Sequence, residues 1–278
     1  MTTTSRVAVV TGATQGLGLA LVEGLARRLG PDDTVYLTGR DAGRVARAAE
    51  AVSGPGARVR GELLDVADPR AAARFAGLVR ERHGGVDVAF SNAVMRIGPG
   101  DDPPAVIDEY TQVNNLGATR ILRALGPLVR DGGRILVVAS TLGTLHHLAP
   151  VLHDRFADSA TLDEVDEQVE TWRDAIRNGD GRAEAWPGFV NIPSKIALVA
   201  AVRALARERQ AQDTRRGILV AAVCPGMINT PTSGLWWDVS GAPSPARAAV
   251  PLLDLALGPV DPEHYGALVR FGRVLPFR

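Results

Sequence analysis

Short apolar runs alternate with longer amphipathic stretches along most of the chain. Six of these runs are rich in Val, Ile, Leu and Ala, a composition typical of strands that are buried on both faces. They cover residues 6–11, 34–38, 58–64, 86–90, 134–139 and 218–223. Between them, apolar residues recur at helical spacing. The alternation predicts a doubly wound α/β fold, in which helices cover both faces of a parallel sheet.

One long stretch, residues 140–195, breaks this alternation. Within it, residues 161–178 are rich in acidic side chains, and the apolar positions are Leu162, Val165, Val169, Trp172 and Ile176. This spacing predicts an amphipathic helix that packs on the domain and exposes an acidic outer face. Because no linker or internal repeat interrupts the chain, we expect one Rossmann-type domain over residues 1–278, with an insertion at about residues 144–188.

The composition is that of a globular protein without a polyanionic partner. Of the 278 residues, 46% are hydrophobic and 22% are charged, which is enough to fill a large core. The 31 basic residues balance the 31 acidic ones, so no overall field attracts nucleic acid or an anionic membrane. Without an apolar run of about 18 residues or a signal sequence, we expect a cytoplasmic protein with a small-molecule substrate. The single cysteine, Cys224, excludes an internal disulfide and a thiolate metal site.

A glycine-rich segment stands between the first predicted strand and the helix that follows it. Its pattern is Thr11-Gly12-x-x-x-Gly16-x-Gly18. Glycines permit a tight turn and let the backbone approach a pyrophosphate, whose charge the start of a helix stabilises. The segment therefore predicts a dinucleotide site. Its residues are Gly12, Thr14, Gln15, Gly16, Leu17 and Gly18.

The spacing of these glycines resembles that of the short-chain dehydrogenase/reductase family, and further matches follow in order along the chain. Leu64-Asp65-Val66 is similar to the segment whose aspartate fixes the adenine. Ser91-Asn92-Ala93-Val94 falls where the family has Asn-Asn-Ala-Gly, and Asn114 matches the helical asparagine that holds a water in the proton relay. The resemblance implies that Asp65, Val66 and Asn92 bind the cofactor and that Asn114 serves catalysis.

The second half of the chain continues the resemblance at the reactive end of the site. The run 133–140 ends on Ser140, which matches the family's catalytic serine. Lys195 matches the catalytic lysine, which also binds the nicotinamide ribose. The segment 224–230 is similar to the loop beside the nicotinamide. The cofactor contacts that this loop implies are Pro225, Gly226, Ile228 and Thr230.

The end of the second predicted strand indicates which dinucleotide binds. An acidic residue there would accept the ribose hydroxyls of NAD and repel a phosphate. The sequence has Thr38-Gly39-Arg40 instead, and Arg40 can form two hydrogen bonds with a 2′-phosphate. We therefore expect NADP (NADPH), although Gln15 stands where many NADP-binding members carry a second basic residue.

The insertion and the segment 184–187 are most similar to the carbonyl reductase branch of this family. In that branch the inserted helix covers the surface through which other members form tetramers, so the resemblance implies a monomer and leaves a dimer open. It also implies a mobile substrate lid at about residues 231–245. The aromatic residues expected to contact a ring-bearing substrate are Trp186, Phe189, Trp236 and Trp237.

The family pattern Tyr-x-x-x-Lys is broken in this chain, because Asn191 stands where the tyrosine belongs. The tyrosine passes a proton to the substrate oxygen, a contribution of about 10²–10⁴-fold in rate. A carboxamide can donate a hydrogen bond but cannot release a proton. Val94 is a second departure, since the family has glycine there and a branched side chain would press on the backbone beside the cofactor. Both changes lie at the reactive end of the site.

Three replacements for the missing acid remain open. The insertion contributes three side chains that titrate near neutrality, and they are His146, His147 and His153. Lys195 can deliver a proton if burial lowers its pKa, directly or through a water held by Asn114 and Ser140. Ser140 and Asn191 can instead form a pair of neutral donors around a developing oxyanion.

These residues support three hypotheses. The first is an NADP-dependent oxidoreductase that transfers hydride between NADPH and a bulky, cyclic ketone, with a non-standard proton donor. The second is a non-redox enzyme, such as a cyclase, isomerase or dehydratase, in which the nucleotide is structural. The third is a nucleotide-binding pseudoenzyme, although retention of Ser140, Asn114 and Lys195 favours an enzyme.

Overall fold

The computed structural model describes residues 5–52 and 54–278. Its eight strands form one sheet, in the order β3-β2-β1-β4-β5-β6-β7-β8. They are β1 (Val7–Val10), β2 (Thr34–Gly39), β3 (Arg58–Leu63), β4 (Val86–Ser91), β5 (Val129–Val138), β6 (Leu219–Cys224), β7 (Leu268–Arg270) and β8 (Arg273–Leu275). The predicted α/β class and all six predicted strands are confirmed.

The last strand corrects the prediction of a wholly parallel sheet. Strands β1 to β7 pair in parallel, whereas β8 runs antiparallel to β7. The two strands join at a turn in which Phe271 and Gly272 both have positive φ. Each strand has only three residues, too few for a periodic pattern to reveal.

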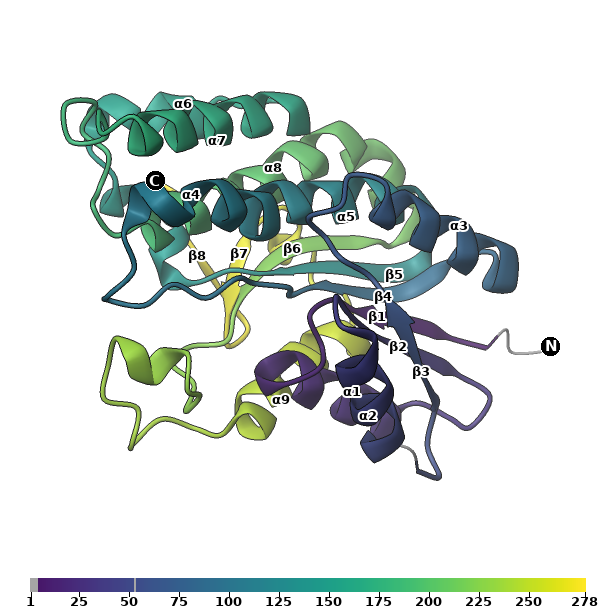
Figure 1. Cartoon of the computed structure of the whole chain (residues 1–278). Helices are drawn as coiled ribbons and strands as arrows, with labels where there is room; N and C mark the ends of the chain where they lie inside the picture. Colours follow the sequence, from purple (N-terminus) through teal and green to yellow (C-terminus); the bar gives the residue numbers. More distant parts are fainter. Residues whose placement is uncertain (1–4, 53) are drawn as a thin grey trace.

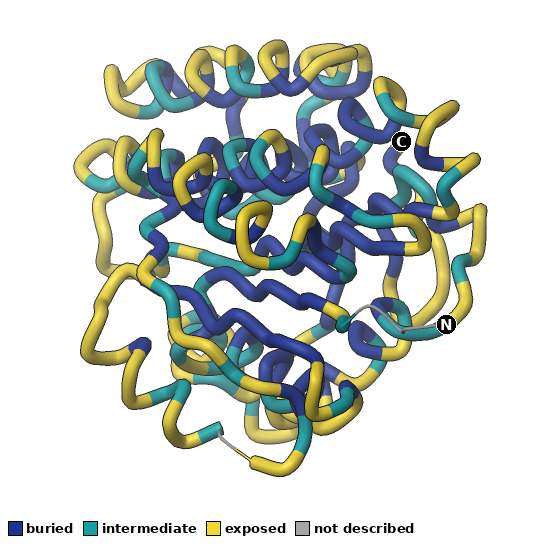
Figure 2. Tube along the Cα trace, turned by 90° about the vertical axis from the view of Figure 1, so that its right-hand side faces the viewer, coloured by how far each residue is buried: buried dark blue, intermediate teal, exposed yellow. Residues whose placement is uncertain are grey.

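Helices cover both faces of the sheet and enclose two apolar cores (Figure 1). One face carries α1 (Gly16–Arg28), α2 (Ala42–Val52) and α9 (Pro245–Leu257). The other carries α3 (Ala71–His83), α4 (Pro103–Thr111), α5 (Gly117–Leu125) and α8 (Asn191–Arg216). Figure 2 shows that the strands in the middle of the sheet are buried and that the outer helices expose one side, whereas the edge strand β3 is mostly exposed. In the described part of the chain, no helix is long and apolar enough to cross a membrane.

Between β4 and β5, helices α4 and α5 are joined by a π-helical turn, Gln112–Leu116. Gly126 and Pro127 lie in a short 3-10 turn after α5, and β5 begins at Val129, five residues earlier than predicted. A π-turn offsets the helix by one residue and often marks a functional position. Here it contains the candidate catalytic residue Asn114.

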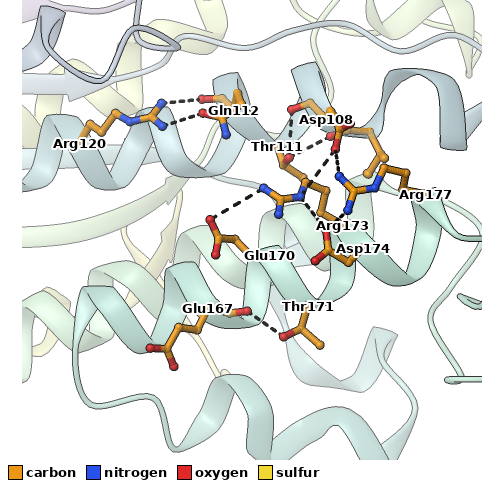
Figure 3. Close-up of polar contacts among 11 residues, drawn as sticks. Asp108, Thr111, Gln112, Arg120, Glu167, Glu170, Thr171, Arg173, Asp174 and Arg177 are labelled. Atoms are coloured by element: carbon orange, nitrogen blue, oxygen red, sulfur yellow. Dashed lines mark hydrogen bonds and ion pairs between the residues drawn. The ribbon is translucent and has the colours of Figure 1, made fainter.

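The insertion places two helices, α6 (His153–Ala157) and α7 (Leu162–Arg177), outside the α4 and α8 layer (Figure 1). As predicted, α7 is amphipathic and begins after Thr161, whose side chain accepts a hydrogen bond from the Glu164 amide. Its inner side buries Leu162, Val165, Val169, Trp172 and Ala175. A polar cluster joins α7 to α4, where the Asp108 carboxylate meets the guanidinium groups of Arg173 and Arg177 (Figure 3). Asp108 and Arg177 are exposed, so these pairs contribute little and the apolar side holds the helix in place.

Candidate functional site

The predicted site residues meet at the carboxyl ends of the parallel strands. Strand β1 pairs with β2 on one side and with β4 on the other, so the order of the sheet reverses at β1. In doubly wound sheets, ligands bind in the crevice at this reversal. The glycine-rich turn follows β1, Asn92 follows β4 and Ser140 follows β5.

The glycine-rich turn packs so tightly that two of its glycines leave no room for a side chain. A Cβ on Gly12 would lie 2.6 Å from the Cα of Ala93, and Gly12 also has a φ of +61°. A Cβ on Gly18 would lie 2.5 Å from the Gly12 carbonyl oxygen. In contrast, Gly16, at the start of α1, faces open space. The turn is therefore a rigid cradle with an open side, which fits a pyrophosphate.

Thr11 and Asn92 hold this cradle against the end of β4. The Thr11 hydroxyl oxygen accepts hydrogen bonds from the amides of Asn92 (2.9 Å) and Ala93 (3.0 Å). The Asn92 side chain donates to the carbonyl oxygens of Thr11 (2.9 Å) and Gly12 (3.2 Å). The structure thus gives Asn92 a role in shaping the phosphate turn.

The side chains at the adenosine end belong to three elements. Asp65 follows β3, and its carboxylate accepts a hydrogen bond from the Ala67 amide at 3.0 Å. Arg40 follows β2, and its guanidinium lies 3.2 Å from the Glu109 carboxylate on α4. Both members of this ion pair are more than half exposed.

A basic residue that the sequence analysis did not select lies beside the glycine turn. The Arg44 guanidinium donates a hydrogen bond to the Gln15 side-chain oxygen at 2.6 Å. Arg44 lies on α2, four residues after Arg40, and a second arginine this close to the end of β2 is the signal that could have identified it. Arg40 and Arg44 together place two positive charges beside the turn.

Lys195 and Ser140 lie on neighbouring elements at the reactive end. Lys195 is in the second turn of α8, and its ammonium donates a hydrogen bond to the Val138 carbonyl oxygen at 3.3 Å. Burial lowers the pKa of Lys195 from 10.5 to about 8, and nearby Cys224 opposes this shift. The Ser140 hydroxyl oxygen accepts a hydrogen bond from the Leu142 amide at 3.2 Å, which leaves its proton free to donate. Lys195 is the only lysine in the sequence.

Asn114 is fixed by the loop that follows β4. Its side-chain oxygen accepts a hydrogen bond from the Met95 amide at 2.6 Å, and its side-chain nitrogen donates to the Met95 carbonyl oxygen at 3.2 Å. Because each backbone group can bond only one end of the carboxamide, the orientation of Asn114 is unambiguous. The residue joins the π-turn to the loop of Val94.

Asn191 begins α8, one turn before Lys195. Its side-chain oxygen accepts a hydrogen bond from the Tyr110 hydroxyl at 2.6 Å. Tyr110 lies on α4 and is fully buried. The two residues are 81 positions apart in the sequence, and the fold brings the phenol directly to Asn191.

The three candidate histidines make their polar contacts within the insertion or with residues next to it. The His146 ring lies 2.7 Å from the Thr144 hydroxyl and 3.8 Å, between ring centres, from His147. The His153 ring lies 2.9 Å from the Leu148 carbonyl oxygen. Burial lowers the pKa of His147, and neighbouring His146 adds to the shift.

Three of the four predicted substrate-binding aromatic residues form one cluster. The Phe189 ring lies 4.8 Å from Trp236 and 6.1 Å from Trp237, between ring centres. The Trp236 ring nitrogen donates to the Ile97 carbonyl oxygen at 2.8 Å, which connects the lid segment to the loop after β4. Trp186 lies elsewhere. It is 4% exposed and packs among the core aromatic residues of the insertion, so its burial corrects the expectation that it lines the substrate site with the other three.

The base of the lid segment is closed by hydrogen bonds. The Asn229 amide donates to the Pro243 carbonyl oxygen at 2.9 Å, which brings the two ends of the segment together. The Thr230 hydroxyl donates to the Ser233 hydroxyl at 3.1 Å. Ser233 is the first residue of a 3-10 turn, Ser233–Leu235. Thr230 therefore supports the lid, whereas Ile228 packs inward.

The conformation of Val94 corrects the expectation that its side chain presses on the backbone. Val94 is 52% exposed, and within the described residues only Ala185 and Phe271 combine a side chain with a positive φ. The valine therefore does not press on the backbone, because its conformation does not require glycine.

Comparison with known proteins agrees with this geometry. Residues 6–150 match the short chain dehydrogenase family. Carbonyl reductase (NADPH) 1 of Sus scrofa is 31% identical over 268 residues, which cover 95% of this chain and 91% of the relative. Salutaridine reductase of Papaver somniferum superposes with a TM-score of 0.80 at 22% identity, covering 95% and 99% of the two chains. Menthone neomenthol reductase of Mentha piperita has a TM-score of 0.76 at 23% identity, covering 98% and 100%.

The fold, the ordered site residues and these similarities define the class of protein. The chain belongs to the short chain dehydrogenase family. The resemblance to the carbonyl reductase branch is confirmed, and so is the prediction of an NAD(P)-dependent oxidoreductase.

Proposed function

We propose that this protein is an NADPH-dependent reductase of bulky ketones. The observation that carries the proposal is the joint presence of a phosphate cradle, Ser140 and a low-pKa Lys195 at one end of the sheet. The similarity to carbonyl reductases supports the same reaction. When bound, NADPH supplies the hydride that reduces the carbonyl carbon.

The residues at the adenosine end fit NADPH better than NADH. Arg40 and Arg44 place positive charge beside the glycine turn, where a 2′-phosphate would accept charge-assisted hydrogen bonds. Asp65 keeps one carboxylate oxygen available after bonding the Ala67 amide. Glu109 holds Arg40 in an ion pair, so a phosphate has to compete with this carboxylate.

The competition gives the first prediction. Arg40→Ala is expected to lower the preference for NADPH over NADH by about tenfold or more, because a charge-assisted bond to the phosphate is lost. Glu109→Gln is expected to tighten NADPH binding by about two- to fivefold without changing NADH binding. Titration of each variant with both nucleotides measures these effects. Arg27→Ala, on the far end of α1, is the control, and equal losses for both nucleotides in Arg40→Ala would contradict the role of Arg40.

At the reactive end, this chain's own residues hold the substrate oxygen and supply the proton. The Ser140 hydroxyl and the Asn191 carboxamide offer hydrogen bonds to a carbonyl oxygen, and such donors stabilise the negative charge that develops on it. Lys195, with a pKa of about 8, is charged at neutral pH and can release a proton to that oxygen through water. Asn191 thus binds the substrate oxygen, as the missing tyrosine would, and Lys195 supplies the proton that the tyrosine would have donated.

The lid aromatic residues favour a bulky, ring-bearing substrate, and this gives the second prediction. NADPH oxidation against a ketone panel should be fastest with bicyclic or aryl ketones. Trp237→Ala is expected to lower kcat/KM for these ketones by about tenfold and to change that for a small acyclic ketone by less than about threefold. Trp237→Phe, which keeps a ring, is the matched control. Equal losses on large and small ketones would contradict a binding role for Trp237.

A non-redox reaction is the second candidate, and the neutral donor pair of Ser140 and Asn191 favours it. Such a pair can polarise a carbonyl for cyclisation, isomerisation or dehydration without any hydride. The ketone panel separates the two functions, because product formed without a change in nicotinamide absorbance would support the non-redox enzyme. Tight NADPH binding without turnover of any substrate would support a pseudoenzyme.

The position of helix α7 bears on the oligomeric state. Helix α7 covers the outer side of α4 and α8, and its Asp163 and Asp166 pair with Arg123 on α5. The covered surface supports a monomer, and a dimer through another surface stays open. The cytoplasm remains the expected location.

A further inference from the structure

Tyr110 is a buried tyrosine whose hydroxyl points at the residue that replaces the family's tyrosine. Its oxygen lies 2.6 Å from the Asn191 side-chain oxygen, and its ring is fully buried. The inserted helix holds the ring in place, because Trp172 of α7 packs edge-on against it at 6.5 Å between ring centres. The phenol is sealed from the crevice, so it does not touch substrate.

The hydrogen bond made by the phenol has a direction. The Tyr110 hydroxyl donates to the Asn191 side-chain oxygen at 2.6 Å. Burial raises the pKa of Tyr110, so the phenol keeps the proton that it donates. A hydroxyl has a single hydrogen, so this bond uses the only donor of the phenol.

This direction determines which end of the Asn191 carboxamide faces the substrate. A carboxamide has an acceptor end and a donor end, and a bond from Tyr110 to the oxygen turns the NH₂ group the other way. Without that bond, the Asn191 oxygen can rotate toward the substrate and repel the negative charge that develops there. The orientation therefore decides whether Asn191 stabilises or opposes the reaction.

We infer that Tyr110 is a positioning residue, which orients the Asn191 carboxamide so that its NH₂ group donates to the substrate carbonyl oxygen. The inference rests on the proposed reductase function. In this chain the tyrosine expected on α8 is replaced by Asn191. The phenol of Tyr110, on α4, contacts the residue that replaces it. The bond from Tyr110 then links α4 to the start of α8.

A double-mutant cycle tests this inference. Tyr110→Phe is expected to lower kcat for ketone reduction by about tenfold, with NADPH binding changed by less than about twofold. In the Asn191→Ala background the same change should have no further effect on kcat, because Tyr110 acts only through Asn191. Tyr36→Phe is the matched control, since Tyr36 is also fully buried and its hydroxyl bonds one side chain, His83. Equal losses in both backgrounds would show a merely structural role and overturn the inference.

A second readout does not depend on turnover. In ¹⁵N-labelled protein, the NH₂ signals of Asn191 are those that disappear in Asn191→Ala. Tyr110→Phe should shift them and Tyr36→Phe should not. Unshifted Asn191 signals in a folded Tyr110→Phe protein would overturn the inference. Shifted signals in a protein that reduces no ketone would instead support the orientation by Tyr110 and reject the proposed reductase function.

Discussion

Replacement of Lys195 by methionine is expected to lower ketone reduction by about 10²–10⁴-fold, the usual contribution of a general acid. Lys195 is the charged group of the site whose pKa burial brings close to neutrality, to about 8. Methionine keeps most of the side-chain volume but carries neither charge nor proton. Initial rates of NADPH oxidation with a saturating ketone measure the loss.

The same residue sets the expected pH dependence. Burial lowers the pKa of Lys195, so its ammonium form is present below pH 8 and is lost as the pH rises above it. If this ammonium supplies the proton, kcat/KM for reduction should be level below about pH 7 and fall about tenfold per unit above pH 8. Because the sequence has a single lysine, ¹³C-methylation of amines gives one side-chain signal whose titration reports its pKa directly.

Lys195→Arg separates charge from proton transfer. Arginine keeps the positive charge but does not release a proton at neutral pH. If the proton comes from Lys195, Lys195→Arg should be nearly as slow as Lys195→Met, and its fall in rate above pH 8 should disappear. A fully active arginine variant would reject Lys195 as the acid and leave a histidine of the insertion as the next candidate.

Most of the architecture could be predicted because it depends on local patterns. The six runs of apolar residues became strands, and the glycines between β1 and α1 formed the expected turn. The β7–β8 hairpin escaped prediction because three-residue strands carry no periodic signal. The early start of β5 at Val129 was also missed, since Arg130 to Gly133 interrupt the apolar run there.

The site was less predictable because its partners are far apart in the sequence. Tyr110 and Asn191 are separated by 81 residues, and only the fold, in which α7 packs against both α4 and α8, makes them neighbours. The Arg40–Glu109 pair spans 69 residues in the same way. The pKa of Lys195 depends on how deeply the start of α8 sits against β5, which no local pattern records. Trp186 showed the opposite error, since a tryptophan near the active segment turned out to fill the core of the insertion.

The insertion therefore has a second consequence beyond covering a surface. Through Trp172 it packs against Tyr110, and through Tyr110 it reaches Asn191. A change in α7 can consequently alter the reactive end without contacting the crevice. Asn191 is thus contacted, directly or through one further residue, by side chains from two other helices, α4 and α7.

Substitution of Asn191 by aspartate is expected to lower kcat by about 10²–10³-fold, the usual effect of losing an oxyanion donor. The carboxylate has nearly the same shape and still accepts the bond from Tyr110. It has no hydrogen to donate, and its negative charge opposes the charge that develops on the substrate oxygen. NADPH titration should show unchanged binding, because the glycine turn, Arg40 and Arg44, and not Asn191, would hold the phosphates of the cofactor.

Asn191→Tyr is the complementary variant, because it restores an acid at this position. Its kcat/KM should no longer fall above pH 8, since the proton no longer has to come from Lys195. An aspartate variant as fast as the parent would contradict the donor role of Asn191. If the tyrosine variant reduces ketones and the parent does not, the parent is not a ketone reductase, and the neutral donors of its site would serve a reaction without hydride transfer.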